Sequence, residues 1–370
     1  MIPRSAPRHG LCRLLLTALA FLAIAALPPV PAAAHGDGLT IETIPTGDPL
    51  RPWFRKRVMV FGIEVVATST AADEKLLHAA AVMAEYLDQD EDSVADHPAV
   101  VLAMQQKRAT LVMFKNSNQL ENSSFWDSAE VDTRWVQDCQ ANETAPVGSF
   151  DASLEETLHL VHTAGIASVH PDLATEVGSA LTLAMDTARG GHFVNVPNPY
   201  PAAAWYHYDD LTCEYDCQAA EYFYWGLTSL MGAQASRCEE IEDEWELCTP
   251  GALAATDSAL YALLIEPAYG LPMALPDGDY HGYANSVCGN GTLELPEICD
   301  DGPANGSGAS CCAADCSLKP DGAASCDGNP CTQDQCNGGE CSTLSCRAGE
   351  SCSMCGGECA GTTANCACVY

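Results

Sequence analysis

The chain has 370 residues and a formal charge of −34 at pH 7, with 50 acidic against 16 basic side chains. A surface this acidic repels nucleic acid and anionic membranes, so neither is an expected partner. Of the 21 cysteines, fifteen lie after residue 287. So many cysteines in so short a segment indicate disulfides, and therefore a compartment outside the reducing cytosol.

The N-terminus has the pattern of a secretory signal peptide. Three arginines precede an apolar run over residues 14–27, and small residues follow at 32–34. Residues 1–34 are therefore predicted to be a signal peptide that is cleaved after Ala34. No later apolar stretch approaches twenty residues, so no membrane span is expected in the mature chain. The predicted location is extracellular, with an extracellular protein or peptide as partner.

Residues 35–283 are long enough to form one domain with a substantial core. Apolar runs predict buried strands over residues 58–67 and 110–114, and helical spacing predicts helices over 71–87, 153–164, 172–189, 217–232, 237–247 and 257–265. The expected fold class is α+β, with a small sheet followed by a mostly helical body. A small disulfide-rich module over residues 288–370 then follows.

Between the first two helical patterns lies an acidic loop. Carboxylates alternate along it at Asp88, Asp90, Asp92 and Asp96. The spacing resembles the first nine residues of an EF-hand loop, although a serine stands at the glycine position and an alanine at the last ligand position. The loop is predicted to bind calcium weakly. A solvated acidic loop is the alternative.

The helix predicted from residue 153 carries Glu155, Glu156 and His159. Residues i and i+4 share a helix face, so Glu155 and His159 could hold one metal ion while Glu156 lies beside it as a general base. Ser153 and Glu156 have the spacing of a capping box. The alternative is that both glutamates favour the helix dipole and that the histidine is a satisfied core residue.

This EExxH spacing resembles the HExxH helix of the zincin metallopeptidases, with glutamate in place of the first histidine. Gluzincins take a third ligand from a later helix, which the segment around Glu221 resembles. The resemblance implies zinc or another divalent transition metal at Glu155, His159 and Glu221. Histidine at 162 departs from the ADAM-type HxxGxxH continuation. Two carboxylate ligands would acidify bound water less, so weak activity, use of another metal, and loss of activity all stay open.

An aromatic segment over residues 205–217 is the second candidate for catalysis. Tyr206, His207 and Tyr208 could line a cleft and donate to a developing oxyanion. They could equally be buried aromatic residues with satisfied polar atoms. Cys213 and Cys217 are expected to form disulfides, with Cys238 and Cys248 as candidate partners.

The tail begins with Cys288-Gly-Asn-Gly and continues to Asp300-Asp-Gly. This opening resembles the disintegrin module that follows the metalloproteinase domain of ADAM and snake-venom proteins, and the short cysteine-rich repeats of secreted bacterial proteins. The resemblance implies a calcium site with side-chain ligands Asn290, Glu294, Glu297 and Asp300. Oxygen ligands within eleven residues suit calcium chemically. Acidic residues that only face solvent are the alternative, and zinc thiolates are disfavoured because the chain looks exported.

Loss of Cys12 with the signal leaves five cysteines in the body and fifteen in the tail. Either one disulfide joins the two parts, or each part keeps a free thiol. Glycosylation sequons begin at Asn122, Asn142, Asn290 and Asn305. The sequence predicts a secreted metallopeptidase-like protein with a calcium-stabilised interaction module. The alternative is a non-catalytic extracellular protein that binds or adheres in a calcium-dependent manner.

Overall fold

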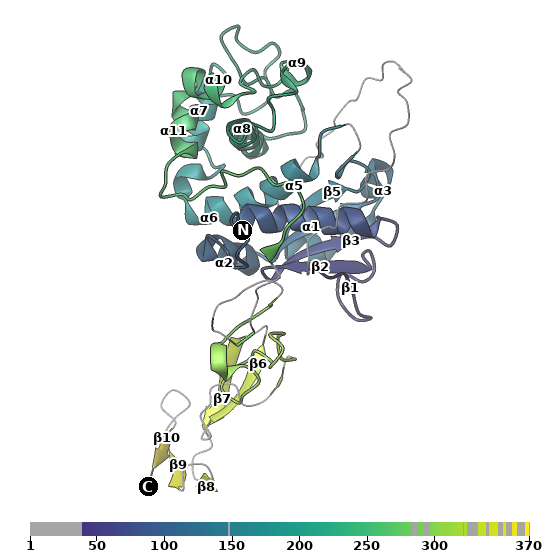
Figure 1. The fold of residues 1–370 in the computed structure, drawn as a ribbon, viewed down its shortest axis with the longest axis vertical. Helices are drawn as coiled ribbons and strands as arrows, with labels where there is room; N and C mark the ends of the chain where they lie inside the picture. The colour runs from purple at the N-terminus through teal and green to yellow at the C-terminus, as the bar shows by residue number, and fades with distance from the viewer. Residues whose placement is uncertain are drawn as a thin grey trace, which may run out of the picture.

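The computed structural model describes residues 39–146, 149–282, 288–289, 291, 297–320 and 322–323, and the strand residues 332–337, 340–346, 351–352, 357–360 and 367–369. The predicted signal peptide lies outside the described residues, as do Asn290 and Glu294 of the predicted calcium site. The structure is α+β, with a mixed five-stranded sheet, a helical layer and a disulfide-rich C-terminal region (Figure 1).

The strands of the body are β1 (Glu42–Thr43), β2 (Lys56–Val60), β3 (Ile63–Ala67), β4 (Ala109–Phe114) and β5 (Trp135–Gln140). They lie in the order β1-β2-β3-β4-β5; the pairs among β1, β2 and β3 are antiparallel, and β3-β4 and β4-β5 are parallel. Every residue of β4 is buried. A strand covered on both faces requires such an apolar sequence.

The single strand predicted over residues 58–67 is wrong, because the chain reverses in its middle. Phe61 and Gly62 connect β2 to β3, and both have positive φ angles, of 46° and 74°. Two such residues form the tight turn that matches the twist of a hairpin. Because the apolar run continues through the turn, hydrophobicity alone gave no sign of the reversal.

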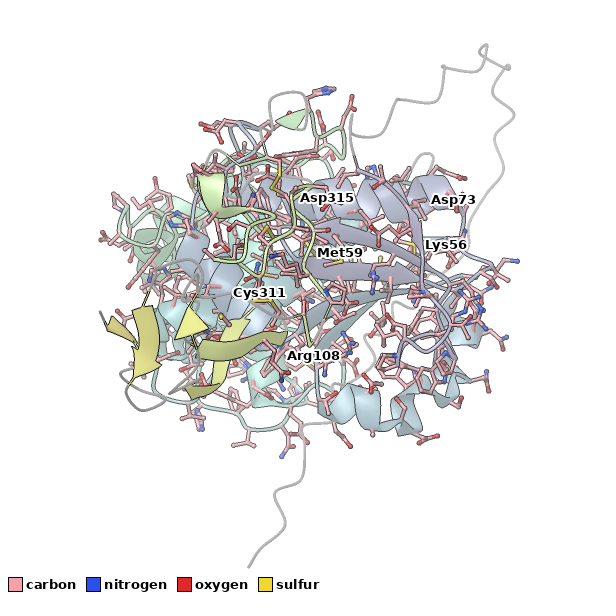
Figure 2. All side chains as sticks on the ribbon, turned by 90° about the horizontal axis from the view of Figure 1, so that it is seen from below. Lys56, Met59, Asp73, Arg108, Cys311 and Asp315 are labelled. Atoms are coloured by element: carbon pink, nitrogen blue, oxygen red, sulfur yellow. A yellow bond between two sulfur atoms is a disulfide. The ribbon has the colours of Figure 1, made fainter. Side chains whose placement is uncertain are left out.

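Helices cover both faces of the sheet. The helices are α1 (Asp73–Leu87), α2 (Pro98–Gln106), α3 (Ser117–Glu121), α4 (Ala129–Asp132), α5 (Ser153–Leu160), α6 (Ala167–Val169), α7 (Ala180–Ala188), α8 (Tyr215–Leu230), α9 (Cys238–Ile241), α10 (Pro250–Thr256) and α11 (Ser258–Leu264). The large core contains side chains from β2 to β4, α1, α2, α5, α7 and α8. A smaller apolar cluster on the other face contains Phe54, Phe114 and Phe125. At the sheet edge, Lys56 forms an ion pair of 2.5 Å with Asp73 in the first turn of α1 (Figure 2).

Several predicted helices are shorter in the structure. The segment predicted over 172–189 forms helix α7 only from Ala180, after the positive-φ Gly178, and the segment over 237–247 is helical only as α9. Helix α5 continues into a π-helical turn, η2 (Val161–Ile166). Its Gly165 is required by close packing, because a Cβ there would lie 2.6 Å from a methyl carbon of Val100 on α2. Such π-helical turns are frequent at functional sites.

Side chains at the end of α1 hold the last segment of the body, mainly by accepting hydrogen bonds from its backbone N–H groups. The Glu85 carboxylate accepts from the N–H groups of Asp277 (2.6 Å) and Gly278 (3.2 Å), and Gln89 accepts from Met273 (2.5 Å). The Tyr280 hydroxyl donates to Asp88. The segment 273–281 is thereby held on α1, about 190 residues away in sequence.

We expect the folded chain to lose stability as pH rises, because Glu85 must ionise in a buried position. Burial, together with the charges of Asp277 and Glu91, raises the pKa of Glu85 from 4.5 to about 7, despite the N–H groups that donate to it. Between these values the folded chain binds more protons than the unfolded chain, so stability falls with rising pH, by about 3 kcal/mol through this group. Glu85→Gln cannot ionise. Unfolding curves at several pH values should show the variant gaining on the parent as pH rises through this window, and a constant difference would contradict the prediction.

All four cysteines expected to be oxidised in the body form disulfides, but each with its sequence neighbour. The pairs are Cys213–Cys217 and Cys238–Cys248. Cys139 on β5 keeps a free, buried thiol. The odd number of cysteines left two possibilities, a disulfide that joins the body to the tail or a free thiol in each part. The body has the free thiol. Burial raises the pKa of this thiol, which makes it unreactive.

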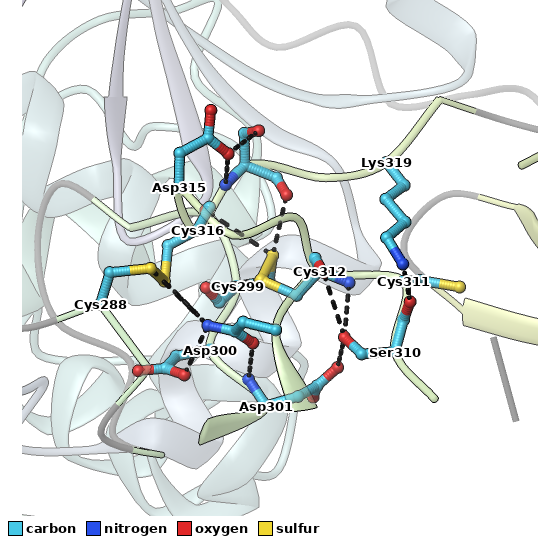
Figure 3. The surroundings of a disulfide bond; sticks show 12 residues. Cys288, Cys299, Asp300, Asp301, Ser310, Cys311, Cys312, Asp315, Cys316 and Lys319 are labelled. Atoms are coloured by element: carbon cyan, nitrogen blue, oxygen red, sulfur yellow. Dashed lines mark hydrogen bonds between the residues drawn. A yellow bond between two sulfur atoms is a disulfide. The ribbon is translucent and has the colours of Figure 1, made fainter. Parts of the chain in front are cut away.

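The first part of the tail is a compact loop crossed by disulfides (Figure 3). Cys288 pairs with Cys316, Cys299 with Cys312, and Cys311 with Cys336. Two short sheets follow, formed by β6 (Thr332–Asn337) and β7 (Glu340–Cys346), and by β8 (Ser351–Cys352), β9 (Gly357–Ala360) and β10 (Ala367–Val369). With so few apolar residues, the covalent links replace a core.

Candidate metal centre

Helices α5 and α8 bring three of the predicted ligands together. Glu155 and His159 lie one turn apart on α5, and Glu221 lies on α8, which packs against α5. One ligand atom from each side chain lies within 4.8 Å of the others. The distance from His159 Nε2 to the Glu221 carboxylate, 3.5 Å, lies in the roughly 3–4 Å range expected between ligands of one bound ion.

The three side chains are buried between the helices, with exposures of 8% for Glu155, 7% for His159 and 3% for Glu221. The Nε2 atom of His159 lies 3.5 Å from a carboxylate oxygen of Glu221. Buried carboxylates are costly unless a positive charge compensates them. The cluster has the donor atoms of a cation site, and a bound cation would take over the compensation that His159 now provides.

The electrostatics of the cluster follow from burial and from the neighbouring carboxylates. Burial and the Glu221 charge raise the pKa of Glu155 well above its usual range. Burial lowers the pKa of His159, but the Glu221, Glu156 and Glu155 carboxylates outweigh it and raise that pKa well above its usual range. Burial and the Glu156 charge also raise the pKa of Asp138, on the adjacent strand β5, to about 7. The surroundings are strongly negative, which favours a cation.

Two tyrosines lie against the three predicted ligands: Tyr208, from the aromatic segment predicted to line a cleft, and Tyr224, which was not predicted. Tyr208 donates to a carboxylate oxygen of Glu221 at 3.2 Å. Tyr224 lies one turn after Glu221, acts on the pKa of Glu155, and meets the His159 ring edge to face at 5.6 Å. Partners of this kind orient metal ligands and tune their basicity. The i, i+3 spacing from Glu221 was a usable signal for Tyr224, whereas Tyr208 lies outside any periodic segment.

Glu156 lies beside the three ligands. One of its carboxylate oxygens accepts a hydrogen bond of 2.6 Å from Gln137 on β5, and the same oxygen lies 3.9 Å from Nδ1 of His159. The predicted capping box is wrong. Ser153 donates to Asp151 instead, and Asp151 also accepts from the Ser153 N–H group. Glu156 therefore does not cap the helix, and its side chain is directed towards His159 and strand β5.

The other two predicted catalytic residues, Tyr206 and His207, bond to backbone oxygens and not to the three predicted metal ligands. The Tyr206 hydroxyl donates to the backbone oxygen of Gln218 at 2.7 Å, inside a cluster with Tyr222 and Trp245. The His207 ring lies 2.9 Å from the backbone oxygen of Ala204. Tyr208 contacts Glu221 in their place. His162 stacks on Phe223 with ring centroids 3.8 Å apart, as a buried core residue.

The acidic loop after α1 places three of its four predicted ligands together. Oxygens of Asp88, Asp90 and Asp96 lie within 4.8 Å of one another. Asp92 instead accepts from the N–H group of Val94. Ser93, at the glycine position of the EF-hand pattern, has a φ of 77°, the left-handed conformation that glycine provides there. The loop therefore adopts the expected turn without the expected residue.

In the tail, Asp300 serves as an acceptor for the loop backbone. Its two oxygens accept from the N–H groups of Gly289 (3.0 Å), Gly291 (3.2 Å) and Gly302 (2.6 Å) and from the Asn305 side chain (2.9 Å). These bonds lower its pKa, although burial acts the other way. Glu297 lies near the sulfurs of Cys288 and Cys316, which are joined in a disulfide and so are not metal ligands.

Because Asp300 satisfies four donors, we expect Asp300→Asn to destabilise the tail even without calcium. An asparagine turns one acceptor atom into a donor that faces backbone N–H groups, at a cost of about 1–3 kcal/mol. Limited proteolysis of parent and variant in chelator should show faster cleavage of the variant's tail. Equal cleavage in chelator, with a difference only when calcium is added, would show that Asp300 acts solely as a calcium ligand.

Comparison with known proteins assigns the chain neither a family nor a function. No protein-family model matches the chain, and neither a curated protein nor a solved structure matches it significantly. Within the described part of the chain, no helix combines the length and hydropathy needed to cross a bilayer. What the protein does is therefore inferred from its own residues.

Proposed function

We propose that the protein is a metallopeptidase-like protein whose centre, formed by Glu155, His159 and Glu221, binds one divalent cation. The observation that carries this proposal is the convergence of these side chains from two helices more than sixty residues apart in sequence. The i, i+4 pair followed by a glutamate on a later helix is also the ligand order of the zincin resemblance.

The residues present fit a divalent transition metal. One imidazole nitrogen and two carboxylates form a donor set suited to zinc and related ions. A dication would compensate the buried carboxylates and accept the lone pair of His159 Nε2, which faces Glu221 at 3.5 Å. Such an ion supplies Lewis-acid chemistry when bound. Since two of the ligands are anionic, we propose that the ion is less acidic than in a site with two imidazoles, and that turnover is slow.

The chain's own residues suit peptide hydrolysis. Glu156 is held by Gln137 next to the ligands, with an oxygen able to accept the proton of an attacking water molecule. The Tyr208 hydroxyl donates to the Glu221 carboxylate and helps to orient it. Several disulfides are compatible with a secreted protein that acts on an extracellular protein or peptide.

The test is a peptidase assay with controlled metal content. The purified full-length protein is stripped with chelator, divided, and reloaded with zinc, cobalt, manganese or calcium before incubation with a mixed peptide library. We expect cleavage after reloading with at least one transition metal and none in the stripped sample. Absence of cleavage with every metal would overturn the peptidase proposal.

The second candidate is a non-catalytic protein that binds partners in a calcium-dependent way. It is favoured by the cluster of Asp88, Asp90 and Asp96 and by the left-handed Ser93 between them. Calcium binding without any transition-metal binding, measured by calorimetry on the stripped protein, would favour this candidate. In that case the predicted tail site of Asn290, Glu294, Glu297 and Asp300 would be the place to look for a second calcium ion.

A further inference from the structure

A second candidate site lies at the sheet edge where two parallel strands end. An open cleft of about 620 Å³ is lined there by Thr68 and Thr70, which follow β3, and by Lys115 and Asn116, which follow β4. Trp53, from the segment before β2, lines the same cleft. In open sheets with helices on both faces, ligands bind outside the carboxyl ends of the parallel strands. No residue of the metal centre lines this cleft.

The chemistry of the lining narrows the ligand class. Eight of the twelve lining residues carry a neutral hydroxyl or amide, Lys115 carries the single charge, and none is acidic. In a chain with 50 acidic residues this lining is unusual. It disfavours a metal ion, which needs carboxylates, and a strongly anionic ligand, which needs several cations. An apolar ligand would need an apolar lining.

The polar groups are fixed in position. Gln119 joins the two strand ends. Its side-chain oxygen accepts from the backbone N–H group of Lys115 at 2.7 Å and from the Thr68 hydroxyl at 3.1 Å. Its amide nitrogen donates to the Thr70 hydroxyl at 3.0 Å. A hydrogen-bonding surface that is already ordered loses little entropy when it binds a ligand.

The aromatic group is fixed as well. The Trp53 indole N–H donates to the Ser124 hydroxyl at 3.0 Å, and its ring meets Phe125 edge to face at 5.5 Å. The side chain is only half-buried, so part of a rigid ring remains at the cleft. A rigid indole next to amides and hydroxyls offers one apolar face and many polar contacts to the same ligand.

We propose that this cleft binds a neutral saccharide. The hydroxyl groups of a sugar both donate and accept, which matches side-chain amides and hydroxyls. The apolar face of a sugar ring packs against an indole. The cleft volume lies within the range of small-molecule sites. The inference does not depend on the metal centre, and it gives the protein a way to attach to glycosylated surfaces or polysaccharides.

The test is direct binding to the full-length protein, produced in a host without N-glycosylation because the sequon residue Asn122 also lines the cleft. Oligosaccharides of glucose, mannose, galactose and N-acetylglucosamine are titrated by calorimetry and by ligand-observed NMR. We expect saturable binding with a Kd of about 1 mM or tighter for at least one of them.

Three variants locate the binding. Asn118 is exposed, so Asn118→Ala leaves the fold intact, and Trp53→Phe keeps a ring in the apolar cluster. Each should weaken binding roughly 3- to 10-fold, because Asn118→Ala removes one polar contact and Trp53→Phe reduces the apolar surface that packs on the sugar ring. Trp126→Phe is the matched control, because Trp126 packs on the same cluster but does not line the cleft. The proposal fails if no oligosaccharide binds, if Trp126→Phe weakens binding as much as Trp53→Phe, or if the cleft binds only charged glycans or peptides.

Discussion

Replacement of His159 by glutamine is expected to remove the divalent cation from the purified protein. In the proposed site His159 is the single nitrogen ligand, and its Nε2 atom faces Glu221. Glutamine is a poor ligand for transition metals, so the affinity should fall by more than about 100-fold. Elemental analysis of protein dialysed against a weak chelator measures the loss, and circular dichroism checks that the fold survives.

His162→Gln is the matched control for this variant. His162 is also a buried histidine and lies one turn further along the same helical run, but it stacks on Phe223 and its Nε2 atom donates to the Leu173 backbone oxygen at 2.8 Å. A glutamine amide can still donate there. We expect metal content to be unchanged in His162→Gln. Equal metal loss in both variants would point to general damage of the helix, and full metal retention in His159→Gln would exclude this histidine as a ligand.

Replacement of Glu156 by glutamine is expected to abolish hydrolysis while leaving the metal bound. Glutamine keeps the size of the side chain, and its oxygen can still accept the hydrogen bond from Gln137. It cannot accept a proton from water, so kcat should fall by about 10²- to 10⁴-fold. Steady-state rates and metal content are measured on the same preparations.

Glu143→Gln provides the control for a change of charge near the centre. Glu143 is half-buried, and burial together with the Glu156 charge raises its pKa, so it belongs to the same negative region without touching the ligands. The rate of hydrolysis by Glu143→Gln should stay within a few-fold of the parent rate. If Glu156→Gln retains the parent rate, Glu156 only positions His159, and another group must act as the base.

Part of this site could be predicted because its signal is local. Glu155 and His159 share a face of one helix, and the helix on which Glu221 lies was clear from its apolar spacing. Gln137 could not be found, because strand β5 has no strict alternation and was not predicted. Tyr208 reaches Glu221 from an irregular segment that only tertiary packing positions.

The same distinction holds for the fold. Long periodic segments such as α1 and α8 formed close to their predicted bounds, whereas the hairpin turn at Phe61 and Gly62 is hidden in an apolar run. The predicted capping box failed because Asp151, two residues before Ser153, is a better acceptor for the helix start and also binds His78 at 2.5 Å. Competition between nearby side chains is not visible in a spacing pattern.

In the tail, the resemblance to a disintegrin module implies that the acidic residues bind calcium. For Asp300 the structure adds a role that a motif does not reveal, because its acceptors face four donors of the loop itself. A carboxylate can serve both a loop and an ion only if the ion replaces some of these donors. The calcium prediction for the tail therefore depends on the response of this loop to added calcium.

The central claim is that one divalent cation is held between helices α5 and α8. The most direct measurement is anomalous diffraction from crystals of the zinc-loaded protein, with data collected on both sides of the zinc absorption edge. We expect a peak at roughly 2.0–2.2 Å from His159 Nε2 and from one carboxylate oxygen each of Glu155 and Glu221. A zinc-loaded crystal with no peak between these three side chains, or with its only peak elsewhere on the protein, would contradict it.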